Sequence, residues 1–283
     1  MDWPPAPTYH PTRHAERRRC PCRAPPDPPT RPPSTPLALP PSTPGQRSPP
    51  IPPTSRPPNV TARKICADHC MAKLGESLAG RDLEILEVLS RRVRMLSLDQ
   101  VASTWWGSTR NATTNAMRRL AVLERRGLLR RMPAMVHQLP GLEQPLLTWR
   151  PGDRTPDLPG IAYRLERRWS SPLRPVVLVA ATREVGSWLG GGGGRKPRES
   201  ELSHDLGLAS LYLRFRGQEP ERAASWIPED LFDPGELEGF VPDAVVREGD
   251  RLTLIEFAGT YKKERLQKLH ASCERTSLPY ELW

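Results

Sequence analysis

The chain has 283 residues, 35 of them proline, and its 42 lysines and arginines against 32 acids give a formal net charge of +10. It contains no apolar run of about 18 or more residues, so we expect no membrane-spanning helix. Its five cysteines are too few for a disulfide scaffold. The first residues lack the charged start and apolar core of a secretory signal, so we expect a cytoplasmic protein.

Residues 1–60 form a proline-rich and basic segment, with 21 of the 35 prolines and 8 arginines against 3 acids. Proline removes backbone donors, and the segment has too little apolar surface to offset chain entropy. We therefore predict a disordered tail with polyproline II character. Such a tail could be a ligand for a proline-binding module, a non-specific nucleic-acid arm, or an extension without a selected role.

Residues 80–150 have the pattern of a winged helix-turn-helix. Helical periodicity starts at Arg81, and the capping box Ser97-Leu98-Asp99-Gln100 predicts the start of a second helix. A turn at Gly107 leads to a third helix, which we expect Ser108 to cap and Gly127 to end. Two β-prone segments follow, and we expect them to form the hairpin of the wing: Leu128–Met132 and Pro145–Trp149.

The polar face of this third helix carries side chains suited to a DNA major groove. Arginine pairs with guanine, asparagine with adenine, and threonine with base edges or phosphates. The predicted DNA-binding residues are Arg110, Asn111, Thr114, Asn115, Arg118 and Arg119. Nearby arginines would neutralise phosphates, and residues 80–150 carry 12 basic against 6 acidic residues. Double-stranded DNA is therefore the expected partner, and a face for protein contacts is the alternative.

The rest of the chain has a different pattern. We predict a linker over residues 151–175 and a second domain over 176–283, which begins with a strand at Val176–Ala180. From Ser200 the order is helix, strand, strand, strand, helix and strand. Asp243 opens the second of these strands, and Glu256 ends the third across a hairpin turn. Two carboxylates in that position could share a divalent cation such as Mg²⁺.

This part of the chain resembles the core of the PD-(D/E)xK nuclease superfamily over about residues 199–283. The resemblance implies that Asp243 and Glu256 are metal ligands and catalytic residues, with Glu201 as an additional acid. The superfamily's lysine would fall at position 258, where this chain has Ala258. Lys262 or Lys263 on the following helix could supply that charge, but we expect an inactive site.

The two halves together resemble the replication-relaxation family of bacterial proteins over about residues 80–283. The motifs are Gln100-Val101-Ala102, Gly127-Leu128-Leu129, His204-Asp205-Leu206, Pro242-Asp243-Ala244 and Ile255-Glu256-Phe257. The resemblance implies a role in plasmid or mobile-element replication and mobilisation, with replication or mobilisation proteins as further partners. The expected fold class is α+β: a winged helix-turn-helix followed by a restriction-endonuclease-like αβββαβ domain, after a disordered tail.

Three functions remain open at this point. The first is a DNA-binding protein whose nuclease-like domain does not cut, acting in replication, mobilisation or local regulation. The second is a Mg²⁺-dependent endonuclease that uses Asp243 and Glu256. The third is an adaptor for a replication or relaxase protein. Ala258 favours the first over the second, and the basic charge of residues 80–150 favours the first over the third.

Overall fold

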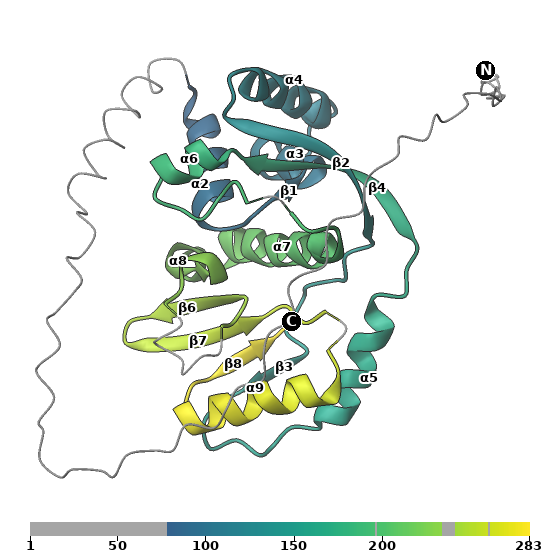
Figure 1. The fold of residues 1–283 in the computed structure, drawn as a ribbon, viewed down its shortest axis with the longest axis vertical. Helices are drawn as coiled ribbons and strands as arrows, with labels where there is room; N and C mark the ends of the chain where they lie inside the picture. Colours follow the sequence, from purple (N-terminus) through teal and green to yellow (C-terminus); the bar gives the residue numbers. More distant parts are fainter. Residues whose placement is uncertain (1–77, 196, 234–240, 260) are drawn as a thin grey trace, which may run out of the picture. The chain divides into compact units, whose positions relative to one another are not determined.

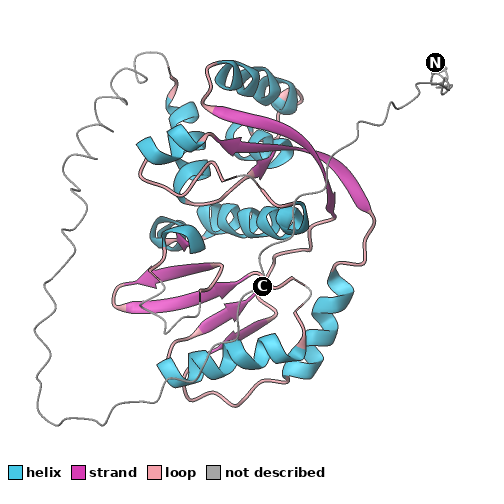
Figure 2. Cartoon of the chain, viewed as in Figure 1, coloured by secondary structure: helices cyan, strands magenta, loops and turns pink. Residues whose placement is uncertain are grey.

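The computed structural model of the chain describes residues 78–283, apart from residues 196, 234–240 and 260. The predicted tail over residues 1–60 therefore lies outside the described residues. The described part is a mixed α+β structure with one three-stranded and one five-stranded sheet (Figures 1 and 2). None of the helices in this part is both long and apolar enough to cross a membrane.

The first two helices form as the sequence predicts. α2 (Gly80–Arg91) is followed by the short strand β1 (Leu96–Ser97) and then by α3 (Leu98–Trp106). The predicted capping box is confirmed at the start of α3. The Gln100 backbone N–H donates to Ser97 Oγ at 3.1 Å, and the Ser97 backbone N–H donates to Gln100 Oε1 at 2.7 Å. These reciprocal bonds satisfy two donors that a helix start leaves free.

The third helix, α4 (Ala112–Arg125), follows the predicted turn. Gly107 has φ 67° and Gly127 has φ 71°, so both positions use the left-handed conformation that glycine adopts without strain. The predicted cap at Ser108 was wrong, because the N-cap position is Asn111 and no side chain caps the helix there. The turn after Gly107 uses the intervening residues, and the helix begins about one turn later than predicted.

The strands after α4 pair differently from the prediction. β2 (Leu129–His137) pairs antiparallel along its whole length with β4 (Leu173–Ala181), and β1 pairs with the other edge of β4. The strand order in this sheet is therefore β1-β4-β2. The predicted hairpin of Leu128–Met132 with Pro145–Trp149 was wrong. β3 (Leu147–Trp149) pairs instead with the C-terminal strand, in the other sheet.

The burial of β4 gives the physical reason for this pairing. Its second half, from Leu178 to Ala181, is fully buried, and an apolar run of this kind suits a central strand with a neighbour on each side. The segment Val176–Ala180, predicted as the first strand of the second domain, is thus the middle of the first sheet. In β3, Trp149 packs on Tyr280, with the two rings stacked at 5.6 Å between centroids.

The predicted linker over residues 151–175 was also wrong in part. It contains α5 (Leu158–Arg168), whose first turn is capped by the Asp157 side chain accepting from the Gly160 N–H at 3.1 Å. Leu158, Ile161 and Leu165 are buried at helical spacing, and α5 packs against α9 (Lys263–Thr276) of the second half. Residues 138–172, which contain β3 and α5, are therefore an excursion between two paired strands of the first sheet.

The second half has the predicted order of elements from Ser200 onward, with one further helix. Helix α6 (Arg183–Trp188) precedes this part and packs against α2. The α-helices from Ser200 onward are α7 (Leu202–Gln218), the further helix α8 (Pro220–Ser225) and α9 (Lys263–Thr276). The strands are β5 (Ile227–Pro228), β6 (Ala244–Glu248), β7 (Arg251–Glu256) and β8 (Tyr280–Leu282). The sheet order is β3-β8-β7-β6-β5, and β7 and β8 are parallel because α9 connects them as a crossover.

Helix α7 lies between the two sheets (Figure 1) and is bonded to both halves. On one side the Gln100 side chain of α3 donates to the Leu206 carbonyl at 3.0 Å and to Ser210 Oγ at 2.7 Å. On the other side Gly207 lies against the ring of Phe257. A Cβ at position 207 would stand 2.1 Å from that ring, so only glycine permits this approach.

Candidate functional site

The structure brings the two predicted acids together at the edge where β6 begins and β7 ends. Ala244 is opposite Ile255 in the antiparallel ladder, so Asp243 and Glu256, one position further along, are also opposite each other. The two carboxyl groups are close enough for each to shift the pKa of the other. Glu256 is 1% exposed, and its neighbour Phe257 is fully buried. The Asp243 side chain is 12% exposed, so the pair is enclosed on the Glu256 side and partly open on the Asp243 side.

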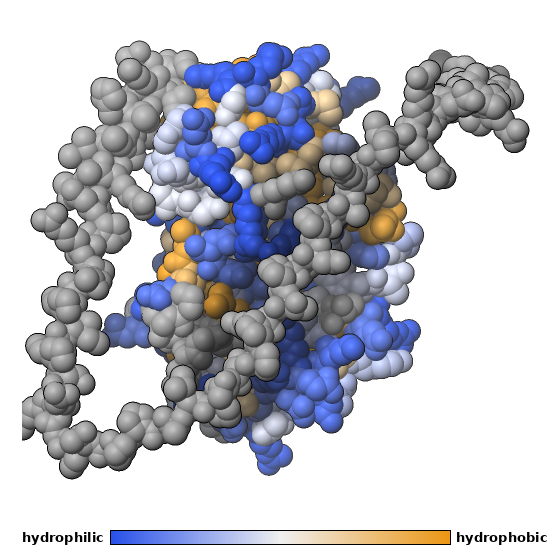
Figure 3. Space-filling view, in the orientation of Figure 1, coloured by the Kyte–Doolittle hydropathy of each residue, from blue (hydrophilic) through white to orange (hydrophobic). Residues whose placement is uncertain are grey.

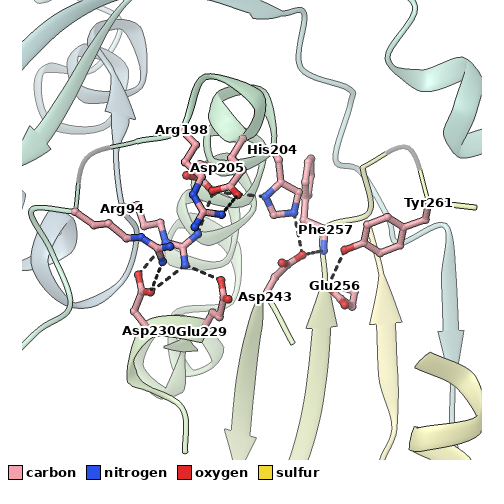
Figure 4. Close-up of polar contacts among 12 residues, drawn as sticks. Arg94, Arg198, His204, Asp205, Glu229, Asp230, Asp243, Glu256, Phe257 and Tyr261 are labelled. Atoms are coloured by element: carbon pink, nitrogen blue, oxygen red, sulfur yellow. Dashed lines mark hydrogen bonds and ion pairs between the residues drawn. The ribbon is translucent and has the colours of Figure 1, made fainter. Parts of the chain in front are cut away.

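A histidine on α7 faces this pair. His204 Nε2 lies 3.1 Å from Asp243 Oδ2, and its other ring nitrogen, Nδ1, lies 3.5 Å from Asp205 Oδ1 (Figure 4). An imidazole with a carboxylate beside each nitrogen is best satisfied when both nitrogens carry protons. Burial opposes the charged form, but the hydrogen bonds to the two aspartates outweigh it and raise the pKa of His204 to about 10.

These contacts shift the pKa values of the two acids in opposite directions. Burial opposes the charged form of Asp243, but the hydrogen bond and attraction to His204 outweigh it, so the pKa of the Asp243 carboxyl lies below its ordinary value. The Phe257 N–H also donates to Asp243 Oδ2 at 2.8 Å. Burial and the negative charge of Asp243 raise the pKa of Glu256 well above its ordinary value. These shifts favour the ionised form of Asp243 and the protonated form of Glu256.

Two further residues complete the environment of Glu256. The Tyr261 hydroxyl lies 3.4 Å from Glu256 Oε2, and the Arg265 guanidinium donates to that hydroxyl at 3.0 Å. Burial raises the pKa of Tyr261 above its ordinary value, so the phenol stays neutral. Glu256 is thus enclosed by Asp243 on one side and by a neutral hydroxyl on the other.

The network continues from His204 to the first half of the chain through Arg94, which lies between α2 and β1. Its guanidinium contacts Asp205 at 3.5 Å and Glu229 at 2.6 Å, and donates to Asp230 at 2.8 Å (Figure 4). Hydrogen bonding to Asp230 raises the pKa of Arg94 despite burial, so the arginine remains charged. The acids of this region therefore have protein cations as partners: Arg94 at one end and His204 at the other.

The residues present do not fit a divalent metal site. The predicted third acid, Glu201, is paired with Arg198 at 2.8 Å and does not join Asp243 and Glu256. No group of three or more potential ligand side chains of the kind that holds a metal occurs in the described part of the chain. Of the two acids that do meet, Asp243 already accepts from a histidine and a backbone amide. The role of Glu201 as a metal ligand stays a prediction.

The lysines predicted to replace the missing catalytic lysine are not in the site. Lys262 and Lys263 are exposed at the start of α9, and neither is among the groups that affect the pKa of Glu256. Ala258 is fully buried, and its N–H donates to the Trp283 carbonyl at 3.1 Å. Position 258 is thus enclosed between β7 and the C-terminus. The cation beside the acidic pair is His204 instead.

The predicted DNA-binding residues divide into two groups. Five of them project from α4 and the turn before it into solvent, and none of the five has a carboxylate partner among the described residues: Arg110, Asn111, Thr114, Asn115 and Arg118. The sixth, Arg119, differs. Its guanidinium forms a two-pronged ion pair with Asp82 of α2, whose side chain is buried. Arg119 therefore joins α4 to α2 rather than extending the exposed set.

Basic side chains also border this face of α4. Arg125 and Arg130 are exposed, whereas Arg131 is held by Glu124 through hydrogen bonds of 2.6 and 2.9 Å. Glu124 is the one acid in α4, so its charge is already matched by Arg131. Figure 3 shows that the surface around α4, at the top of the view, is mostly hydrophilic with small apolar areas between.

Sequence reasoning missed the roles of His204, Asp205 and Arg94. The pair His204-Asp205 appeared only as part of a family motif, without a function for either side chain. A polar pair on an otherwise apolar helix was the available signal, because buried charged groups need partners. The partner of Asp243 could not be found from spacing alone, since 39 residues separate it from His204.

Comparisons of the chain with protein-family models, with curated proteins and with solved structures found no match. The resemblance to the replication-relaxation family therefore stays a prediction from short motifs, and the functional argument depends on the geometry of the two regions described above.

Proposed function

We propose that this chain binds double-stranded DNA through the exposed face of α4, and that its acidic pair serves structure rather than cleavage. The order helix, strand, helix, helix, strand, strand, with the sheet order β1-β4-β2, resembles a winged helix-turn-helix. In this interpretation α4 is the recognition helix and β2 and β4 form the wing. Residues 138–172 are an insertion between the two wing strands.

The exposed face of α4 carries the proposal. Its arginines have no carboxylate partner in the described part of the chain, and its single acid, Glu124, is already paired. A helix face with unmatched cations, two amides and a threonine hydroxyl combines phosphate attraction with groups that read base edges.

The second half supports a binding protein over an endonuclease. The order of α7, β5, β6, β7, α9 and β8 resembles the nuclease core, and Asp243 and Glu256 stand where its acids would be. The raised pKa of Glu256 and the positive charge of His204 reduce the negative charge of the pair. No ion pair joins a lysine of the described residues to either acid. We therefore propose a nuclease-like domain that does not cut, in a protein of plasmid or mobile-element replication, mobilisation or local regulation.

The test is a binding titration of the full-length protein with a fluorescently labelled duplex, measured by anisotropy. We expect the affinity to fall steeply as the salt concentration rises, because phosphate contacts release counterions. Arg118→Ala should weaken binding by about 1–3 kcal/mol if the side chain reads a base edge. Arg164→Ala is the matched control, since Arg164 is also exposed but lies on α5, and it should bind as the wild type does.

Two outcomes contradict the proposal. Affinity that does not depend on salt, or equal losses in Arg118→Ala and Arg164→Ala, would remove α4 as the DNA-binding face. Nicking of supercoiled plasmid with Mg²⁺ or Mn²⁺ that is present in the wild type and absent in folded Glu256→Gln would establish an endonuclease instead.

A further inference from the structure

The exposed face of α4 contains a small apolar groove among its polar side chains. Met117, which is 43% exposed, stands near its centre and is one of few large apolar side chains exposed in the described part of the chain. The groove encloses about 410 Å³. Its lining residues are Thr113, Thr114, Met117, Arg118, Ala121 and Arg131.

The position of Met117 distinguishes it from an incidental exposed side chain. Thr114, Met117 and Ala121 follow one another at intervals of three and four, so they form a single stripe along the helix. Arg118 and Arg131 also line the groove, and Arg131 is held by Glu124. The apolar stripe thus runs through the middle of the face that carries the unmatched positive charge.

The chemistry of the groove selects one kind of occupant within DNA. In the major groove of a duplex, the C5-methyl group of thymine is the apolar group that the base edges present. A threonine methyl, a methionine side chain and an alanine methyl are contacts suited to it. The surrounding arginines have the charge to hold the phosphates on either side.

We propose that the groove formed by Thr114, Met117 and Ala121 receives the C5-methyl of a thymine, and that the chain therefore prefers duplexes with an A·T pair at that position. This inference rests on the proposed DNA binding by α4. It goes further by assigning the apolar stripe a role in choosing the sequence, while the arginines supply attraction to any duplex.

The experiment removes the methyl group without changing the hydrogen-bonding edge of the base. The full-length protein is first used to select tight-binding duplexes from a random-sequence library. Each thymine of the selected site is then replaced in turn by deoxyuridine, and the affinity is measured at constant salt. For the wild type we expect one or two positions at which the replacement weakens binding about fourfold, which corresponds to ~0.8 kcal/mol for one buried methylene-sized group.

Variants identify the side chain responsible. In Met117→Ala the ratio of thymine to deoxyuridine affinity at that position should fall to about one, while the salt dependence of binding stays that of the wild type. Met117→Gln, which keeps the length of the side chain but adds an amide, should also lose the ratio. Leu231→Ala is the matched control, because Leu231 is 41% exposed but lies outside this groove and outside α4, β2 and β4, and it should keep the wild-type ratio.

The possible failures are distinct. A wild-type protein that binds duplexes in a salt-dependent way but shows equal affinity for thymine and deoxyuridine at every position would overturn this inference and leave the proposed function standing. A ratio that persists in both Met117 variants would also overturn it, since another residue would then contact the methyl. Failure to bind any duplex would overturn the proposed function itself.

Discussion

His204 is a cation that contacts one of two neighbouring carboxyl groups, that of Asp243. Two ionised carboxylates within hydrogen-bonding distance repel each other, and a protein reduces that repulsion with a metal ion, a proton or a charged side chain. The structure favours the last two: His204 contacts Asp243 at 3.1 Å, and the raised pKa of Glu256 favours its protonated form. A group that would otherwise attract metal is thereby made part of the protein's internal packing.

The raised pKa of Glu256 predicts how the stability of the variant Glu256→Gln depends on pH. The pKa of Glu256 lies above its ordinary value of 4.5 in the folded protein, so folding takes up a proton at any pH between those two values. That uptake costs stability as the pH rises, by up to ~1.4 kcal/mol per pH unit, and glutamine avoids the cost. We expect Glu256→Gln to match the wild type near pH 5 and to exceed its stability at pH 7 and 9.

Urea unfolding followed by tryptophan fluorescence at these three pH values measures the difference. The wild type should still lose stability between pH 6.5 and about 10. In that range the folded protein holds the His204 proton and the unfolded chain releases it. A stability difference between variant and wild type that is the same at pH 5, 7 and 9 would mean that Glu256 is ionised in the folded protein.

At the scale of the element, α4 has two faces with different tasks. Its buried face packs Ala116, Leu120 and Leu123 against the neighbouring helices, and Arg119 beside them holds the buried carboxylate of Asp82. The opposite face presents Arg118 and its neighbours to solvent. Adjacent arginines in the sequence therefore serve stability in one case and, as we propose, recognition in the other.

This division predicts that two neighbouring alanine substitutions differ in their effect on the stability of the fold. Arg119→Ala removes the cation of Asp82, which keeps only the hydrogen bond from the Ala79 N–H, so it should destabilise the fold by about 1–3 kcal/mol. Arg118→Ala removes an exposed side chain without a partner among the described residues, so its effect on stability should stay within about 0.5 kcal/mol. Thermal or urea unfolding of the two variants checks this. Equal stability of both would show that the Asp82 ion pair contributes little.

Local patterns in the sequence predicted those elements whose signals are local. The capping box at Ser97, the glycine turns at positions 107 and 127, and the hairpin between β6 and β7 all depend on residues a few positions apart. The pairing of β2 with β4 could not be predicted in this way. A nearer β-prone segment, residues 145–149, competed for the same partner, and strand pairing depends on burial that periodicity does not report.

The candidate site was likewise predicted only where its contacts are local in the sequence. Asp243 and Glu256 were predicted to meet because a hairpin fixes their register. The identity of their cation depended on the packing of α7 against the sheet, which brings His204 across from a distant part of the chain. The charge of α4 was visible in the sequence, but the burial of Asp82, which commits Arg119, was not.

At the scale of the whole described part, the two sheets depend on each other through the excursion of residues 138–172. After β2 the chain first forms β3 and α5, which pack with the second half, and only then enters the first sheet again as its central strand, β4. Helix α7 then contributes side chains to the apolar core shared by both sheets, with Leu211 and Phe215 fully buried there. Neither sheet is complete within a continuous half of the sequence.

A fragment of residues 78–150 therefore should not fold. It contains α2, α3, α4 and β2 but lacks β4, so the edges of β1 and β2 would have no partner and the buried side chains of α3 would be exposed. We expect no cooperative thermal transition by circular dichroism, while the full-length protein shows one. A cooperative transition in the fragment would mean that the three helices form a stable unit without the sheet.

The excursion between β2 and β4 also limits how a gene for this protein could exchange parts with another. A recombination event that joined a foreign first half at any point within residues 138–172 would combine a new β2 with a resident β4, across a ladder that runs from Leu129 opposite Ala181 to His137 opposite Leu173. The inherited β3 and α5 would face the same mismatch with β8 and α9. If α4 binds DNA as we propose, new specificity would therefore arise more readily by substitutions on the surface of α4 than by the shuffling of whole segments.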